Sequence, residues 1–71
     1  MAKSKHARED FDAQQIARAK YFTACKFLGQ GKYDRREAPT QAEAERIGRE
    51  IGGAMIYAVT PENWSIHIRN V

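Results

Sequence analysis

The side chains that could do chemistry in this chain of 71 residues are one cysteine, Cys25, and two histidines, His6 and His67. A cysteine nucleophile needs a positioned base, so Cys25 and His67 are the one pair that could form a catalytic centre. Nothing like a nucleophile elbow surrounds Cys25, and free cysteines are commonly small buried hydrophobic residues. The three residues also lack the C-x-x-C or H-x-x-x-H spacing of a zinc site. We therefore expect no enzyme activity, no metal and no cofactor.

The basic side chains are the other candidates for function, because they are unevenly distributed. The net charge is +3, but residues 18–36 carry six basic groups and one acid, a net charge of +5. Residues 37–71 carry five acids and three bases. Basic groups neutralise phosphates, and aromatic rings on an open sheet stack on unpaired bases. The side chains expected to contact a partner or a nucleic acid are Lys20, Lys26, Lys32, Tyr33, Arg35, Arg36, Tyr57, His67 and Arg69.

The same basic residues also fit a purely structural interpretation. Natural sheets place Lys and Arg on their edge strands, where they prevent pairing with another chain. The RNP-type aromatic motif of RNA-recognition sheets is absent from the sequence. A binding surface and a guarded sheet edge therefore both remain open at this level.

Residues 39–53, PTQAEAERIGREIGG, predict the main helix of the fold, with both of its ends marked. Thr40 is the N-cap candidate, and Glu43 completes a T-x-x-E capping box. Gly52 and Gly53 can take the left-handed conformation that ends a helix. Small and aliphatic residues recur at helical spacing and would form one narrow face. The residues of this face are Ala44, Ile47, Gly48 and Ile51.

Residues 21–28, YFTACKFL, fit two alternatives. Aromatic residues followed by Gly29, Gln30 and Gly31 predict a strand that enters a hairpin. A helix that ends at Gly29 is the alternative. Residues 32–38, KYDRREA, need a neighbouring strand, and the turn supplies one immediately upstream. We therefore predict a hairpin and keep a long N-terminal helix as its competitor.

Residues 54–59 and 64–68 predict a second hairpin around the turn 60–63, TPEN. Proline has its favoured second position in this turn. Strict alternation in 64–68 sends its three large apolar side chains to one side of the strand. The side chains expected under the main helix are Trp64, Ile66 and Ile68.

These elements predict an α+β fold: a two-layer sandwich of order ββαββ with a mainly antiparallel four-stranded sheet and one main helix. Residues 9–20 have the composition of a short N-terminal helix. The main helix would cover one face of the sheet, and the other face would be open or covered by the N-terminal segment. We expect function on that open face.

We expect the chain to consist of a disordered basic arm at residues 1–8 and a single small domain at residues 9–71. No apolar run approaches the roughly 20 residues of a membrane span, and the N-terminus lacks the apolar region of a signal peptide. One cysteine allows no disulfide within the chain, which favours the cytoplasm. A core this small needs tight packing or self-association, so a homodimer is one expected assembly.

The order of elements is a short hairpin, a T-x-x-E-A-type helix and a returning hairpin. This order resembles the layout of small phage-encoded inhibitor proteins, including certain anti-CRISPR proteins and inhibitors of host RNA polymerase. The same layout occurs in antitoxin-like bacterial proteins. The resemblance covers residues 21–68 and rests on YFTACKFL, KYDRREAPTQAEAERI and AMIYAVTPENW. It implies steric occlusion of a host nucleoprotein machine without catalysis. The basic hairpin differs from the strongly acidic surface of DNA-mimic inhibitors, so mimicry of DNA is not expected.

Two functions follow from these observations. The first is a small non-enzymatic binding or inhibitor protein that occludes a larger protein or nucleoprotein complex. The alternative is direct binding of DNA or RNA by the basic hairpin and the open sheet face. Exposed tyrosines and arginines suit a protein interface, whereas a segment of charge +5 suits phosphates. The salt dependence of binding separates the two, because phosphate contacts release counterions.

Overall fold

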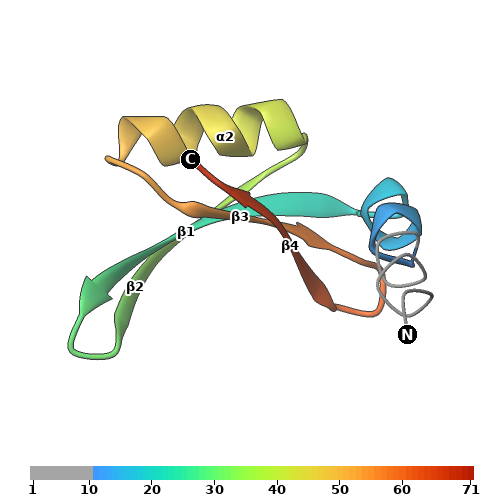
Figure 1. Cartoon of the computed structure of the whole chain (residues 1–71), viewed down its shortest axis with the longest axis horizontal. Helices are drawn as coiled ribbons and strands as arrows, with labels where there is room; N and C mark the ends of the chain where they lie inside the picture. Colours follow the sequence, from blue (N-terminus) through green and yellow to red (C-terminus); the bar gives the residue numbers. More distant parts are fainter. Residues whose placement is uncertain (1–10) are drawn as a thin grey trace, which may run out of the picture.

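A four-stranded antiparallel sheet with one helix across one face forms the protein (Figure 1). The computed structural model describes residues 11–71. A short helix at 11–17 is followed by β1 (Tyr21–Gly29), β2 (Lys32–Ala38), α2 (Gln41–Glu50), β3 (Met55–Val59) and β4 (Ser65–Asn70). The predicted α+β class, the order ββαββ and the short N-terminal helix are therefore confirmed.

The strands lie in the order β2-β1-β3-β4, and every neighbouring pair is antiparallel. Residues 21–28 belong to a strand, as predicted, so the alternative of a long N-terminal helix is wrong. The hairpin between β1 and β2 closes through Gln30 and Gly31, whose φ angles are 54° and 72°. Positive φ at both central residues is typical of the type I′ turn, whose twist matches that of paired strands. The left-handed backbone of this turn therefore favours a strand over a helix for residues 21–28.

The first turn of α2 forms half of the predicted capping box. The hydroxyl of Thr40 accepts a hydrogen bond from the Glu43 backbone N–H at 3.2 Å, which satisfies one unpaired donor of the helix. The reciprocal bond from Thr40 N–H to the Glu43 side chain is not formed. The Glu43 carboxylate instead accepts a hydrogen bond from Arg46 at 2.7 Å, one turn along the helix. A cationic partner at this spacing competes with the backbone for the carboxylate.

The last turn of α2 ends in a Schellman motif, as the two glycines predict. Gly53 donates its N–H to the carbonyl of Gly48 at 2.8 Å, and Gly52 donates to Arg49 at 3.1 Å. Both glycines have positive φ, at 91° and 110°, which side chains rarely tolerate. The chain therefore leaves the helix sharply and enters β3.

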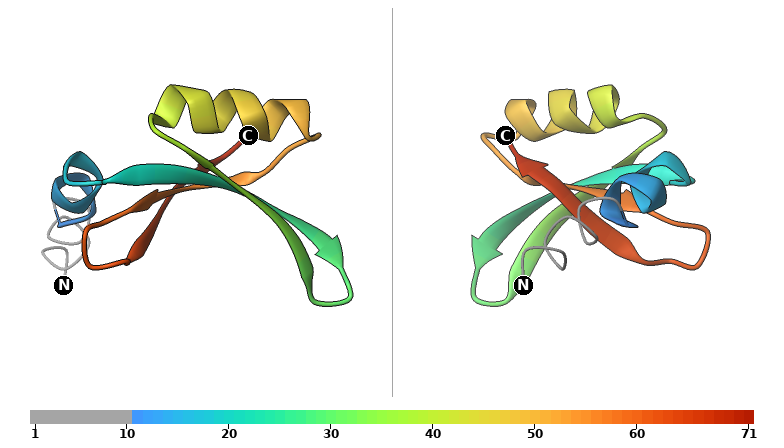
Figure 2. Two further views of the ribbon diagram at one scale, coloured as in Figure 1. Left: turned by 180° about the vertical axis from the view of Figure 1, so that it is seen from behind. Right: turned by 45° about the vertical axis from the view of Figure 1, so that its right-hand side comes forward.

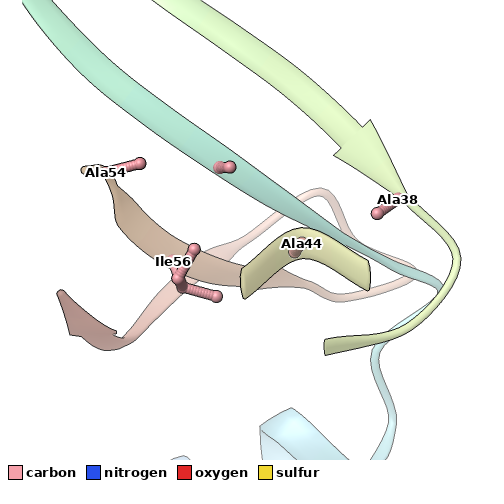
Figure 3. Close-up of a cluster of buried hydrophobic side chains, with 5 residues drawn as sticks. Ala38, Ala44, Ala54 and Ile56 are labelled. Carbon is pink, nitrogen blue, oxygen red and sulfur yellow. The ribbon is translucent and has the colours of Figure 1, made fainter. Parts of the chain in front are cut away.

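The core between α2 and the sheet consists mainly of alanines. Ala24, Ala38, Ala44 and Ala54 form one buried cluster with Ile56, which has no exposed surface. Figure 3 shows this cluster between α2 and the sheet. Small side chains let the helix backbone approach the sheet closely, and larger ones seal the margin of the cluster. The side chains at this margin are Phe22, Ile47, Ile51, Ile68 and Val71.

The prediction that Trp64 lies under the helix is wrong. Trp64 belongs to the turn before β4 and is 51% exposed. The helix lies over β1, β2 and β3, whereas β4 is at the far edge of the sheet. Of the predicted trio, Ile68 packs against the core cluster and Ile66 is half-buried. Ile56 on β3 takes the central place that the sequence pattern assigned to β4.

Gly48 lies on the side of α2 that faces the sheet, with no space for a side chain. A Cβ at this position would lie 2.8 Å from the Val71 side chain, 3.2 Å from Ala54 and 3.3 Å from Ile56. These distances are shorter than normal carbon contacts. The absence of a side chain at Gly48 therefore sets the separation of the two layers.

The predicted disordered arm at residues 1–8 lies outside the described residues. Within residues 11–71, the structure contains no helix long and apolar enough to cross a membrane.

Replacement of Gly48 by valine tests the close approach of helix and sheet. We expect Gly48→Val to lower the free energy of unfolding by about 1–3 kcal/mol, because the added methyl groups overpack the layer. Ala42→Val is the matched control: it introduces the same residue on the exposed side of the same helix and costs about 0.5 kcal/mol through helix propensity. Thermal or urea unfolding measures both. Equal losses for the two variants would contradict the packing described above.

Candidate functional site

The face of the sheet turned away from α2 is the candidate binding surface. On β1, Ala24 packs under the helix and Lys26 contacts its C-terminal end, so the alternating residues Cys25 and Phe27 point to the opposite side. We call this side the open face. The side chains that point to this face are Tyr21, Thr23, Cys25 and Phe27 on β1, Tyr33, Arg35 and Glu37 on β2, Met55, Tyr57 and Val59 on β3, and Ser65 and His67 on β4. Thr23 and Val59 among them are buried.

The N-terminal helix lies at one end of this sheet, beside the β3–β4 turn (Figure 2). Two contacts hold the segment after this helix to that turn: Arg18 pairs with Glu62 at 2.7 Å, and Lys20 donates to Asn63 at 2.7 Å. The hydrogen bond from Arg18 holds the pKa of the Glu62 carboxyl below its usual range. The opposite end of the open face is left uncovered by the described elements.

That uncovered end continues into a two-stranded projection, which we call the hairpin extension (residues 26–34). β3 pairs with β1 only from Tyr21 to Cys25, so β1 beyond Cys25 has β2 as its one neighbour. Figures 1 and 2 show this part of the hairpin reaching away from the helix and the rest of the sheet. Lys26, at its base, contacts the end of α2, and the extension beyond Lys26 presents its apolar side chains to solvent.

Three large apolar side chains gather on the extension. Phe27, Leu28 and Tyr33 are 54%, 58% and 58% exposed. The rings of Phe27 and Tyr33 are cross-strand partners with centroids 5.1 Å apart. A register shift between Phe27 and Gly29 makes Leu28 an extra residue of β1, next to Phe27 in the chain. Exposed apolar groups in contact with one another typically mark an interaction site.

A second aromatic pair lies on the β3–β4 side of the open face. The rings of Tyr57 and His67 are 5.4 Å apart in an edge-on arrangement. The imidazole Nε2 of His67 lies 2.8 Å from Asn70 Oδ1, and the hydroxyl of Tyr57 donates to the sulfur of Met55 at 3.5 Å. These contacts fix both rings on the surface. The two pairs give the open face an aromatic character along its length.

The two arginines of β2 point to opposite faces, and each has an acidic partner in its own strand. Arg35 donates to Glu37 at 3.1 Å on the open face, while Arg36 donates to Asp34 at 3.1 Å on the helix side. The pKa of Arg35 is raised by the hydroxyl of Tyr21 and by Glu37, and that of Arg36 by Asp34. The predicted basic hairpin is therefore partly neutralised within one strand.

Two further predicted residues serve the fold. Lys26 donates to the carbonyl of Ile51 at the end of α2, where a cation also suits the helix dipole. Arg69 lies 3.7 Å from Glu45 on α2. Hydrogen bonding by Gln41, followed by the charges of Arg69 and Arg49, holds the pKa of Glu45 below its usual range.

The structure thus brings together four of the nine predicted residues: Tyr33, Arg35, Tyr57 and His67 share the open face. Lys32 is exposed where the hairpin turns, and Lys20 lies over the ring of Tyr21, 5.5 Å from its centroid. Phe27 and Leu28 lie on the hairpin extension but are not among the residues predicted from the sequence. The sequence does contain an indication of their exposure. The tight turn that directly follows Leu28 places both residues at the end of the hairpin, where β1 no longer pairs with β3.

A shallow hollow lies at the end of β2 that is opposite to the hairpin turn. Its volume is about 330 Å³, and it is lined by Lys20, Tyr21, Glu37, Ala38 and Pro39. Tyr21 and Glu37 belong to the open face, so the hollow opens on the same side as Tyr33. Its lining combines an aromatic ring with one cationic and one anionic group.

Cys25 and His67 lie in different parts of the open face. Cys25 faces Arg35 and Met55 across the strands, whereas His67 faces Tyr57. β3 lies between their strands, which separates the two backbones by about 10 Å. Among residues 11–71, no group of three His, Cys, Asp or Glu side chains could hold a metal ion.

Comparison with known proteins gives no match: no family model, no curated protein and no solved structure matches this chain.

The role of Lys26 as a helix cap can be separated from a role in binding. We expect Lys26→Met to lower the free energy of unfolding by about 0.5–1 kcal/mol, because α2 loses a cation at its carbonyl end. Lys32→Met removes the same charge from the exposed hairpin turn and should leave stability unchanged. Urea unfolding of both variants makes the comparison. A stability loss that is equal in the two variants would refute the capping role.

Proposed function

We propose that this protein is a non-catalytic binding protein that attaches to a larger protein or nucleoprotein assembly and occludes one of its surfaces. It binds through the open face, with the hairpin extension as the leading contact. One observation carries the proposal: Phe27, Leu28 and Tyr33 are each more than half exposed on a projecting hairpin, and the rings of Phe27 and Tyr33 are in contact. Such a cluster has the composition of an interface core.

The shape of the extension supports insertion into a partner. Backbone pairing to β2 holds β1 in place, and the contact between Phe27 and Tyr33 restricts both rings. Aromatic side chains ordered before binding cost less conformational entropy when they are buried in a complex. The extension can therefore present a preformed contact to a groove on its partner.

The pairing of charges supports a protein partner over a nucleic acid. Arg35 and Arg36 carry Glu37 and Asp34 as local partners, so a phosphate would have to compete with two carboxylates. The one basic residue of the extension with neither an acidic partner nor a helix contact among the described residues is Lys32. A single cation gives little of the counterion release that drives nucleic-acid binding.

The layout supports occlusion as the mode of action. Small phage-encoded inhibitors, which the order of elements resembles, act by covering a surface, and a chain of 8.1 kDa is suited to that role. Cys25 is a free, half-exposed thiol, which a reducing compartment preserves. We therefore assign the activity to the cytoplasm.

Affinity capture with matched variants tests the proposal. The tagged protein should retain a specific partner from a lysate of cells that express it, and Phe27→Ser with Leu28→Ser should reduce the retained amount at least tenfold. Phe11→Ser is the control, because Phe11 is a 48% exposed phenylalanine at the other end of the molecule. Retention of the same partner by the double variant would contradict binding through the extension.

Direct nucleic-acid binding is the competing outcome. Binding to mixed-sequence single-stranded DNA, duplex DNA and RNA should be weak and should change little with salt. Several phosphate contacts would instead lower the affinity by roughly 0.9 log units per contact for each decade of salt on duplex DNA. A steep slope that Lys32→Ala and Arg35→Ala together flatten would make nucleic acid the ligand and overturn the proposal.

A further inference from the structure

β2 is the better of the two sheet edges for pairing with another strand. β4, at the opposite edge, pairs with β3 through a register shift between Ile56 and Tyr57, and such bulges disfavour further pairing. β2 pairs with β1 in regular register from Ala38 to Tyr33 and carries no proline. Its outer side has no partner strand within residues 11–71. A free edge strand of seven residues, six of them in regular register, is thus available.

The charges along this edge are complementary to a second copy of themselves. An edge strand whose charges all have one sign repels an incoming copy of itself. β2 instead carries both signs on each face: Asp34 and Arg36 on the helix side, and Arg35 and Glu37 on the open face. An antiparallel copy centred on Arg35 places Asp34 opposite Arg36 of the second copy, and Arg36 opposite its Asp34. Opposite charges at directly facing positions stabilise strand pairs. The two Arg35 side chains meet at the centre, and each has its own Glu37 as a partner.

The same register explains two otherwise separate features of the open face. It places Tyr33, 58% exposed, opposite Glu37 of the second copy. Glu37 lines the hollow of about 330 Å³, together with Lys20, Tyr21 and Pro39. Tyr33 and the hollow lie at opposite ends of one edge and on one face, so a two-fold axis through Arg35 brings each tyrosine to the hollow of the other copy. The lysine and glutamate there can hydrogen-bond the phenol.

We propose that two copies of this chain pair through β2, antiparallel and centred on Arg35, with Tyr33 of each copy seated in the hollow of the other. The product is a continuous eight-stranded sheet whose two open faces lie on the same side. Such an isologous arrangement is the commonest form of a homodimer. This inference goes beyond the proposed function, because it uses the edge of the sheet. It seats Tyr33 against the second copy and leaves Phe27, Leu28, Tyr57 and His67 available to another partner.

Charge exchange between separately prepared variants tests the pairing. The full chain should form a concentration-dependent dimer in sedimentation equilibrium. Asp34→Arg alone and Arg36→Asp alone should each weaken the dimer about tenfold or more, because like charges then face one another. An equimolar mixture of the two variants should restore the dimer as a heterodimer, since both facing pairs between positions 34 and 36 become opposite in sign. Local effects on folding within one chain cannot produce that recovery.

The contribution of Tyr33 is measured in the same experiment. Tyr33→Ala should weaken the dimer, whereas Tyr57→Ala, which lies on the open face away from β2, should not. A protein that stays monomeric throughout the micromolar to millimolar range would overturn the inference. So would a dimer that neither single charge variant weakens, or one that mixing fails to restore. Partner capture through Phe27 and Leu28 is scored separately, so failure of one proposal is distinguishable from failure of the other.

Discussion

The close contact between α2 and the sheet is the constraint on which the rest of the structure depends. Gly48, Ala44 and Ala54 leave little room between the layers, so one fully buried isoleucine, Ile56, fills the centre of the core. A small core of this kind gains its stability from close packing rather than from a large buried area. The Schellman motif and the contact from Lys26 fix the end of the helix from which β3 starts.

A helix of ten residues cannot cover a four-stranded sheet, and the consequences shape the surface. α2 lies over three strands on one face, so the other face keeps its aromatic pairs in contact with solvent. The hairpin between β1 and β2 is longer than β3, and its last residues project with Phe27 and Tyr33 exposed. The proposed contact with a partner uses the face that the helix leaves open, and the proposed pairing with a second copy uses the free edge of β2.

The fold could be predicted from the sequence wherever local chemistry was decisive. The glycine turn after Leu28 settled strand against helix, and Thr40 with Gly52 and Gly53 marked both ends of α2. Alternation in β4 did not reveal that the strand lies at the sheet edge, and Trp64 was therefore assigned to the core. Residue type indicated the nine candidate residues but not the face of the sheet on which each one lies. Arg35 and Arg36, for example, lie on opposite faces because side chains alternate along a strand. Roles such as that of Lys26 depend on contacts between segments distant in sequence, which no local pattern contains.

The central claim is that the sheet has one covered face and one open face, and that the open face ends in an exposed apolar cluster. The most direct measurement is the line broadening that a soluble paramagnetic agent causes in the proton NMR signals of the full chain. The account predicts strong broadening for the side chains of Phe27, Leu28 and His67, and protection for the methyl groups of Ala24, Ala44 and Ile56. Protection of Phe27 and Leu28 equal to that of Ile56 would contradict it.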